Sequence, residues 1–209
     1  MIDDEKIPEP TLRRLPWYLA YLKIVANEGQ VYISSTQIAQ ALDISAPQIA
    51  KDLSFIKISG KTRIGYDVSK LIVVLENFLG FNRIHKAYIF GTGYLGTSLL
   101  LDKGLRQYGL EIVAGFDVKP EVVNTQINGV NVYHMDTLAE HLRQDEVEIG
   151  ILTVPVNKAQ AVTDYITAQG IGTIWNFTPF RIRVGDNIVV QNTSIYAHLA
   201  VMYNRLENR

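Results

Sequence analysis

Three glycines near the middle of the 209-residue chain have the spacing of a phosphate-binding loop. Gly91, Gly93 and Gly96 form a G-x-G-x-x-G pattern that follows the apolar run 87–90 and opens a helical stretch. In this pattern the first glycine permits a tight turn, the second lets the backbone approach a pyrophosphate, and the third lets the helix pack on the strand. Helix amides and the helix dipole then face the anion. This context predicts a dinucleotide-binding loop, and the alternative is a turn that needs glycines merely to turn.

An acidic residue stands where such a site usually has one. Asp117 follows a second apolar run, 112–116, and lies about 20 residues beyond Gly96, the distance at which an acid binds the adenosine ribose hydroxyls. Its charge would repel a 2′-phosphate, which favours NAD over NADP, and the nearby Lys119 would soften that preference. We therefore expect the cofactor to be NADH/NAD.

Further cofactor contacts are expected at the ends of two later apolar runs, because ligands of open α/β sheets lie outside the carboxyl ends of the strands. Ordinary loop chemistry is an equally good account of these later residues, since Pro and Asn are favoured in turns anyway. The candidate cofactor residues are Gly91, Thr92, Gly93, Tyr94, Leu95, Gly96, Asp117, Thr153, Val154, Pro155 and Asn176.

The elements that would position these residues alternate between strand-length apolar runs and helical stretches, which predicts a Rossmann-like parallel sheet in an α/β fold. The strand-length runs are 87–90, 112–116, 147–154 and 173–177. Before residue 81 the pattern is helical, so we expect an N-terminal domain at 1–80 and a nucleotide-binding domain at 81–209. The chain closes with a helix whose apolar side carries Ile195, Leu199, Met202 and Leu206.

The first eighty residues have the pattern of a winged helix-turn-helix. Thr11 is a possible cap of the first helix, which Pro16 is expected to kink or restart. Two short helices follow, the second capped by Ser45 with Gln48 completing a capping box. A basic turn between two short strands, 60–66, would be the wing.

The second short helix and the wing carry the side chains that would face double-stranded DNA. The alternative is a small helical dimerisation or lid domain whose charges are simply solvated. The candidate DNA-binding residues are Ser45, Gln48, Lys51, Ser54, Lys61 and Arg63.

Side chains for catalysis are harder to find, and we predict no catalytic and no metal-binding residues. The chain has no cysteine and four histidines, of which only His134 follows a strand-like run closely enough to approach a sheet end. A dehydrogenase needs a proton donor or acceptor beside a substrate pocket. We therefore expect the protein to bind the nucleotide as a signal and not to use it as a substrate, which favours a regulator. The alternatives are a small NAD-dependent oxidoreductase with a helical lid and a CoA-binding protein.

Composition excludes the more unusual classes. The chain is 47% hydrophobic and 20% charged, with a net charge of -1, as in ordinary globular proteins. Its start lacks a basic flank followed by an apolar segment, and apolar runs such as 71–75 are too short to cross a bilayer. We expect a cytoplasmic location.

Taken together, these motifs resemble one family, the redox-sensing transcriptional repressor Rex of bacteria. The resemblance covers nearly the whole chain, at 11–16, 33–35, 48–54, 65–68, the glycine loop, 116–118, 149–155 and 176–179. It implies a homodimer whose winged helices bind an operator and whose Rossmann domains bind NADH or NAD in competition, with NADH releasing the DNA. It also implies that the terminal helix, 194–209, is a swapped element that packs on the partner subunit.

Several positions depart from the pattern of that family. Ala50 stands where the family usually has an arginine in the recognition helix, and the segment 55–60 replaces the usual Phe-Gly pair before the wing. Asp102 and Ser194 align with a tyrosine and an aspartate that help to couple the cofactor to DNA release. The resemblance therefore predicts an altered operator preference and an altered switching network.

Overall fold

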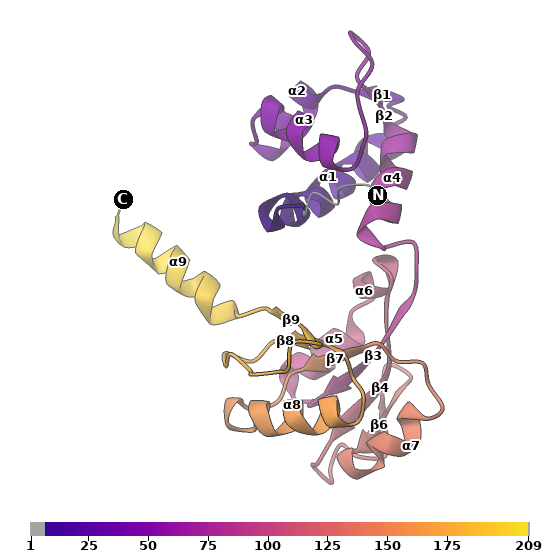
Figure 1. The fold of residues 1–209 in the computed structure, drawn as a ribbon, viewed down its shortest axis with the longest axis vertical. Coiled ribbons are helices and arrows are strands. Elements are labelled where there is room, and N and C mark those ends of the chain that lie inside the picture. The colour runs from indigo at the N-terminus through magenta and orange to yellow at the C-terminus, as the bar shows by residue number, and fades with distance from the viewer. Residues whose placement is uncertain (1–6, 209) are drawn as a thin grey trace. The chain divides into compact units, whose positions relative to one another are not determined.

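The structure, a computed structural model, describes residues 7–208, and the chain divides into two compact units, Met1–Arg83 and Ile84–Arg209 (Figure 1). The elements of the first unit are α1 (Glu9–Asn27), β1 (Tyr32–Ile33), α2 (Ser35–Leu42), α3 (Ala46–Phe55), β2 (Tyr66–Asp67) and α4 (Val68–Leu79).

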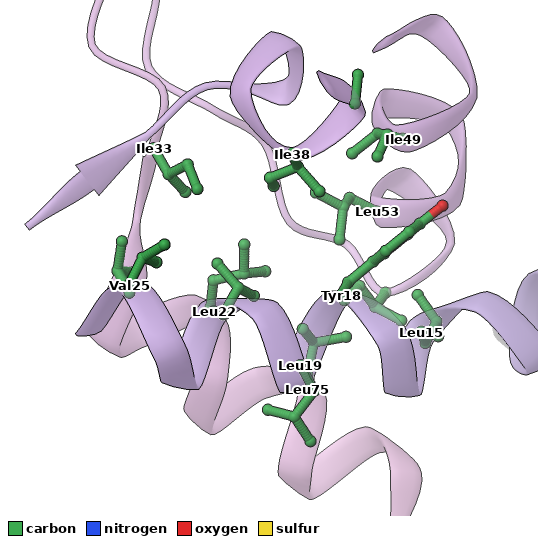
Figure 2. Packing of buried hydrophobic residues seen from close by; sticks show 14 residues of the cluster. Leu15, Tyr18, Leu19, Leu22, Val25, Ile33, Ile38, Ile49, Leu53 and Leu75 are labelled. Atoms are coloured by element: carbon green, nitrogen blue, oxygen red, sulfur yellow. The ribbon is translucent and has the colours of Figure 1, made fainter. Parts of the chain in front are cut away.

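The core of the first unit forms where α1 packs against the other helices. Leu15, Tyr18, Leu19 and Leu22 follow the helical repeat along one side of α1 and are fully buried. Figure 2 shows these side chains among residues of α2, α3 and α4, here Ile38, Ile49, Leu53 and Leu75. The helix-turn-helix pair, α2 and α3, is therefore held in place by α1.

The first helix differs from the expectation at two residues. It begins at Glu9 after Pro8, so the prediction that Thr11 caps it is wrong, and the hydroxyl of Thr11 instead donates to Asp52. The helix also continues through Pro16 without restarting. A proline removes one backbone hydrogen bond and crowds the carbonyl four residues before it. The buried side chains of α1 on both sides of Pro16 keep the element continuous despite this cost.

The caps of the two following helices are built from serines. Ser34 and Gln37 form a capping box at α2, with each side chain bonded to the other residue's backbone N–H. Ser45 caps α3 by accepting from the backbone N–H of Gln48 at 3.4 Å, but the Gln48 side chain turns away from Ser45. The expected capping box at α3 is thus only half formed.

The wing is a tight turn that the N–H and C=O groups of Lys61 and Gly65 close by bonding to each other. Arg63 lies at its tip with a φ of 67°. The strand before the turn is reduced to this single bridge, and β2 after it pairs with β1 in antiparallel register. A side chain at Gly65 would come within 2.3 Å of the carbonyl oxygen of Ile33, so glycine lets the wing base lie directly on β1.

The second unit is built on a seven-stranded sheet with the order β5-β6-β4-β3-β7-β8-β9. All neighbours are parallel except β5 and β6. When β5 is left out and the other six strands are numbered 1 to 6 along the chain from β3, their order across the sheet is 3-2-1-4-5-6. This is the Rossmann order. The strands are β3 (His85–Phe90), β4 (Leu110–Asp117), β5 (Thr125–Ile127), β6 (Val130–His134), β7 (Ile149–Leu152), β8 (Thr173–Asn176) and β9 (Val189–Asn192).

Alternating residues of β3 cover the two faces of this sheet. Tyr88 and Phe90 pack with the cluster that includes α7 and α8, whereas Ala87 and Ile89 pack with α5. Both faces are thus closed by helices, as a parallel sheet requires. The helices are α5 (Tyr94–Leu101), α6 (Gly104–Gln107), α7 (Leu138–Leu142), α8 (Ala159–Ala168) and α9 (Ile195–Glu207), and η1 (Met135–Thr137) and η2 (Val156–Lys158) are 3-10 turns. No helix within residues 7–208 is long and apolar enough to cross a membrane.

Candidate functional site

The glycine loop connects β3 to α5, and two of its glycines are required by the fold itself. Gly91 has a φ of 91°, and a Cβ there would lie 3.0 Å from the backbone of Thr153. A Cβ on Gly96 would lie 2.1 Å from the carbonyl oxygen of Gly91. These glycines make the turn and the close helix–strand packing possible.

Gly93 has no such internal reason to be glycine. Its φ is -64°, which any residue adopts, and a Cβ built on it would meet nothing within 4 Å. The missing side chain therefore leaves open space at the start of α5, where the amides of the first helical turn lack acceptors within the helix. This cradle fits a pyrophosphate approaching the backbone. Tyr94, the next residue, is 99% exposed, and Leu95 is half-buried.

The carboxylate of Asp117 fastens this loop to the end of β4. One oxygen, Oδ2, accepts from the backbone N–H and the hydroxyl of Thr92 at 2.7 and 3.0 Å. The other oxygen, Oδ1, accepts from the N–H groups of Val118 and Lys119 at 2.7 and 3.1 Å. Burial raises the pKa of Asp117, but these bonds outweigh it and hold the pKa below its ordinary value.

This arrangement limits how Asp117 can recognise a ribose. A carboxylate offers about four lone-pair positions, and four protein donors already occupy them here. A ribose hydroxyl would have to share an oxygen of Asp117 with one of these donors or displace it. The side chain therefore holds the loop in shape, whichever atoms of a ligand it also meets.

The segment after β7 lies against the glycine loop. The hydroxyl of Thr153 donates to the carbonyl oxygen of Gly91 at 2.6 Å, and a Cβ on Gly91 would come within 3.0 Å of Val154. Pro155 is exposed and precedes η2. Because β3 and β7 are neighbours where the strand order reverses, this is the switch point at which Rossmann folds bind their ligands.

Asn176, at the end of β8, is buried and fully engaged within the protein. Its amide nitrogen donates to Phe180 and Asn192, and its oxygen accepts from the N–H and the hydroxyl of Thr178. Asn176 therefore ties β9 and the loop after β8 together, and the polar atoms of its side chain have partners within the chain. The sequence reasoning found Asn176 but missed Asn192, whose role depends on the pairing of β8 with β9.

In the first unit, the candidate DNA-binding residues lie on α3 and on the wing. Lys51, Lys61 and Arg63 are exposed cations. The hydroxyl of Ser54 donates to the carbonyl oxygen of Lys51 at 2.7 Å, and Ser45 is engaged as the cap of α3. The exposed positive charges thus remain available to an anionic partner, whereas both serines serve the helix.

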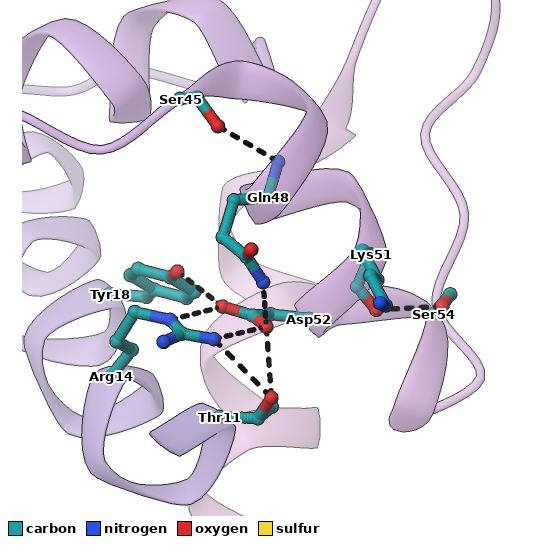
Figure 3. A network of polar contacts seen from close by, with 8 residues as sticks. All are labelled: Thr11, Arg14, Tyr18, Ser45, Gln48, Lys51, Asp52 and Ser54. Carbon is teal, nitrogen blue, oxygen red and sulfur yellow. Dashed lines mark hydrogen bonds and ion pairs between the residues drawn. The ribbon is translucent and has the colours of Figure 1, made fainter. Parts of the chain in front are cut away.

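Figure 3 shows that Gln48 belongs to a polar network around Asp52, a residue the sequence reasoning did not single out. The Asp52 side chain is fully buried and accepts from four side chains. The donors are Thr11 at 3.0 Å, Arg14 at 2.7 and 2.8 Å, Tyr18 at 2.7 Å and Gln48 at 2.8 Å. Burial alone would raise the pKa of Asp52. The hydrogen bonds from the four donors outweigh this effect and lower the pKa to about 2.

Asp102 and Ser194, which the resemblance aligns with coupling residues of the family, each accept a hydrogen bond from a backbone N–H at the start of a helix. Asp102 accepts from the backbone N–H of Leu105 at 2.9 Å, at the start of α6. The hydroxyl of Ser194 accepts from the N–H of Ala197 at 3.2 Å, at the start of α9. Both residues lie in the second unit, and each has a local structural role there.

The fold and the two sites define a class of protein, a transcriptional regulator that joins a winged helix-turn-helix to a Rossmann nucleotide-binding domain. Two family models match, "Putative DNA-binding protein N-terminus" at residues 6–54 and "CoA binding domain" at residues 82–180. The chain is 58% identical over 205 residues to the redox-sensing transcriptional repressor Rex of Bacteroides thetaiotaomicron, covering 98% of this chain and 93% of that protein. It is 40% identical to the Rex repressor of Treponema denticola, over 96% of this chain and 97% of that protein. The chain therefore belongs to the Rex family.

Solved structures agree with this assignment. A crystal structure of RSP in complex with β-NAD+ and operator DNA has a TM-score of 0.92 and 28% identity, covering 97% of this chain and 93% of that one. RSP in complex with β-NADH has a TM-score of 0.86 and 28% identity, covering 97% and 95%. The predicted fold class is confirmed. The relatives are named as repressors, so the regulator is confirmed over the oxidoreductase.

Proposed function

We propose that this protein represses transcription by binding an operator through its winged helix-turn-helix, and that NADH bound at the glycine loop releases it. The observation that carries the cofactor assignment is Gly93, whose missing side chain serves no packing or backbone need and leaves space for a ligand. The RSP complexes with β-NADH and with β-NAD+ and operator DNA support this assignment. They favour NADH/NAD over CoA, despite the name of the matching family model.

At the cofactor site the groups divide into two kinds. The backbone around Gly93, with Tyr94 and Leu95 beside it, would contact the dinucleotide directly. Asp117 would hold the loop and meet the adenosine ribose by sharing an oxygen. When bound, the nicotinamide supplies the redox state that is sensed.

At the DNA site, Lys51 on α3 and Lys61 and Arg63 on the wing would neutralise phosphates. Gln48 would face the base edges in the major groove. Because Ser45 and Ser54 already bond to backbone groups of α3, we expect them to contribute less to DNA affinity than Gln48 and the three cations.

The terminal helix supports a homodimer. Within α9 no described residue is buried, and the exposed large apolar side chains are Ile195, Tyr196, Val201, Met202, Tyr203 and Leu206. Apolar surface of this extent usually marks an interface. We infer that a second copy of the chain covers α9. A dimeric repressor that reads the cellular NADH/NAD ratio would act in the cytoplasm.

A mobility-shift titration tests this function. The purified protein is mixed with a candidate palindromic operator and titrated with NADH, with NAD and, as a control nucleotide, with CoA. NADH should release the DNA at lower concentration than NAD, and CoA should have no effect. The proposal fails if the protein binds neither pyridine nucleotide at millimolar concentration, or if NADH binds and leaves the protein–DNA complex unchanged.

A further inference from the structure

Asp52 is a fully buried carboxylate on the helix that would enter the DNA groove, and stability alone explains it poorly. Transferring a carboxylate into a protein core is costly, and a buried ion pair often contributes no more to stability than apolar residues of the same size would. In this chain Arg14, Tyr18 and Thr11 from α1 and Gln48 from α3 all turn toward that one carboxylate. Such a convergence is better explained by the orientation it imposes.

Among these four donors, the one on the helix that would enter the groove is the side-chain amide of Gln48. This side chain is half-buried and lies one helical turn before Asp52, between the exposed residues Pro47 and Lys51. Its nitrogen, Nε2, donates to Asp52 Oδ1 at 2.8 Å (Figure 3). An ionised Asp52 can only accept hydrogen bonds. If the Gln48 amide were turned over, its Oε1 would face Asp52 Oδ1 and the two oxygens would repel each other. The contact therefore fixes which end of the amide is nitrogen and which is oxygen.

A fixed amide has a defined preference among bases. In the major groove, adenine and cytosine present an amine hydrogen, whereas guanine and thymine present carbonyl oxygens in the corresponding places. The free oxygen of Gln48, Oε1, accepts from an amine and is repelled by a carbonyl. The second hydrogen on Nε2 remains for the N7 acceptor of a purine.

We propose that Asp52 is a positioning residue for DNA recognition, which locks the Gln48 amide so that, at one position of one strand, its oxygen selects a base that presents an amine in the major groove, adenine or cytosine, over guanine or thymine. The proposal rests on the DNA-binding function proposed above. It adds to that function the chemistry of one base position and the residue that sets it.

The test is a binding panel in which each base pair of an operator half-site is replaced in turn. Wild type, Gln48→Met, Asp52→Asn and the double variant are compared by fluorescence anisotropy at fixed salt. Gln48→Met keeps the side-chain length and removes both polar atoms. We expect it to abolish discrimination at one position, where wild type prefers adenine or cytosine by roughly 5- to 150-fold. Asp52→Asn should reduce discrimination at that same position, and the double variant should lose no more than Gln48→Met.

Other outcomes overturn the proposal, and they are distinguishable from failure of the DNA-binding function. An Asp52→Asn loss that is uniform across the panel means that the carboxylate only supports the fold. A wild-type preference for guanine or thymine at the position that depends on Gln48 refutes the amide orientation without needing the Asp52 variant to fold. An unchanged profile for Gln48→Met removes Gln48 from base reading. In that case Lys51→Ala, which should weaken binding to all sequences alike, shows whether DNA binding itself stands.

Discussion

The carboxylate of Asp52 should make the first unit sensitive to acid in a way that can be measured directly. Its pKa of about 2 lies below the ordinary value of 3.8. A group whose pKa is lower in the folded state stabilises the fold above its unfolded pKa and loses that contribution as the pH falls through the folded value. The difference of nearly two pKa units corresponds to about 2 kcal/mol, lost between about pH 4 and pH 2.

The measurement compares wild type with Asp52→Asn, which cannot titrate at this position. The chain has two tryptophans, Trp17 in α1 and Trp175 in β8, so both proteins carry Trp175→Phe and Trp17 alone reports on the first unit. Urea unfolding is followed by fluorescence at several pH values from 6 to 2. Wild type should be the more stable protein at pH 6, and its advantage should shrink by about 2 kcal/mol as the pH approaches 2.

The comparison removes the other acids from the result, because carboxylates such as Asp117 titrate identically in both proteins. A gap in unfolding free energy that stays constant from pH 6 to pH 2 would refute the reasoning, since it would mean that Asp52 has an ordinary pKa or is not ionised in the fold. A gap that widens on acidification would contradict its sign.

Three further predictions concern the cofactor, the DNA and the dimer. Gly96→Ala should abolish NADH binding in a fluorescence titration because its Cβ would lie 2.1 Å from a backbone oxygen, whereas Gly172→Ala, where a Cβ meets nothing within 4 Å, should bind NADH normally. Lys51→Ala should weaken operator binding and lower the slope of log affinity against log salt by about 1, with NADH affinity unchanged, and an unaltered slope would exclude the phosphate contact. Met202→Glu should convert the protein to a monomer in sedimentation velocity by placing a charge on the apolar side of α9, and a persisting dimer would show that α9 is not the interface.

Much of the Rossmann unit could be predicted from the sequence because its determinants are local. The glycine pattern, the apolar strand before it and the acid after the next strand are read along the chain, and Gly91, Gly96 and Asp117 all meet at the loop as expected. In the first unit α4 also has local determinants, because its apolar residues and the Gly80 that ends it lie in one short segment. Local spacing is enough where one short segment both makes an element and ends it.

The interactions that could not be predicted join residues far apart in the sequence. Thr11 and Asp52 are 41 residues apart, and only the packing of α1 on α3 brings them together. In isolation Thr11 has the character of a helix cap and Asp52 that of a solvated charge. Asn176 likewise has the character of a turn residue until the pairing of β8 with β9 places it beside Asn192. For these residues the fold decides the role.

The close seating of Gly65 on the backbone of Ile33 separates two properties of the wing. Its anchorage depends on a position that tolerates no side chain, while the three residues at its tip, 62–64, have exposed side chains. We therefore expect substitutions of these exposed side chains to leave the base of the wing in place. Charge changes at the tip should then alter the strength of binding to DNA phosphates and leave the attachment of the wing to β1 as it is.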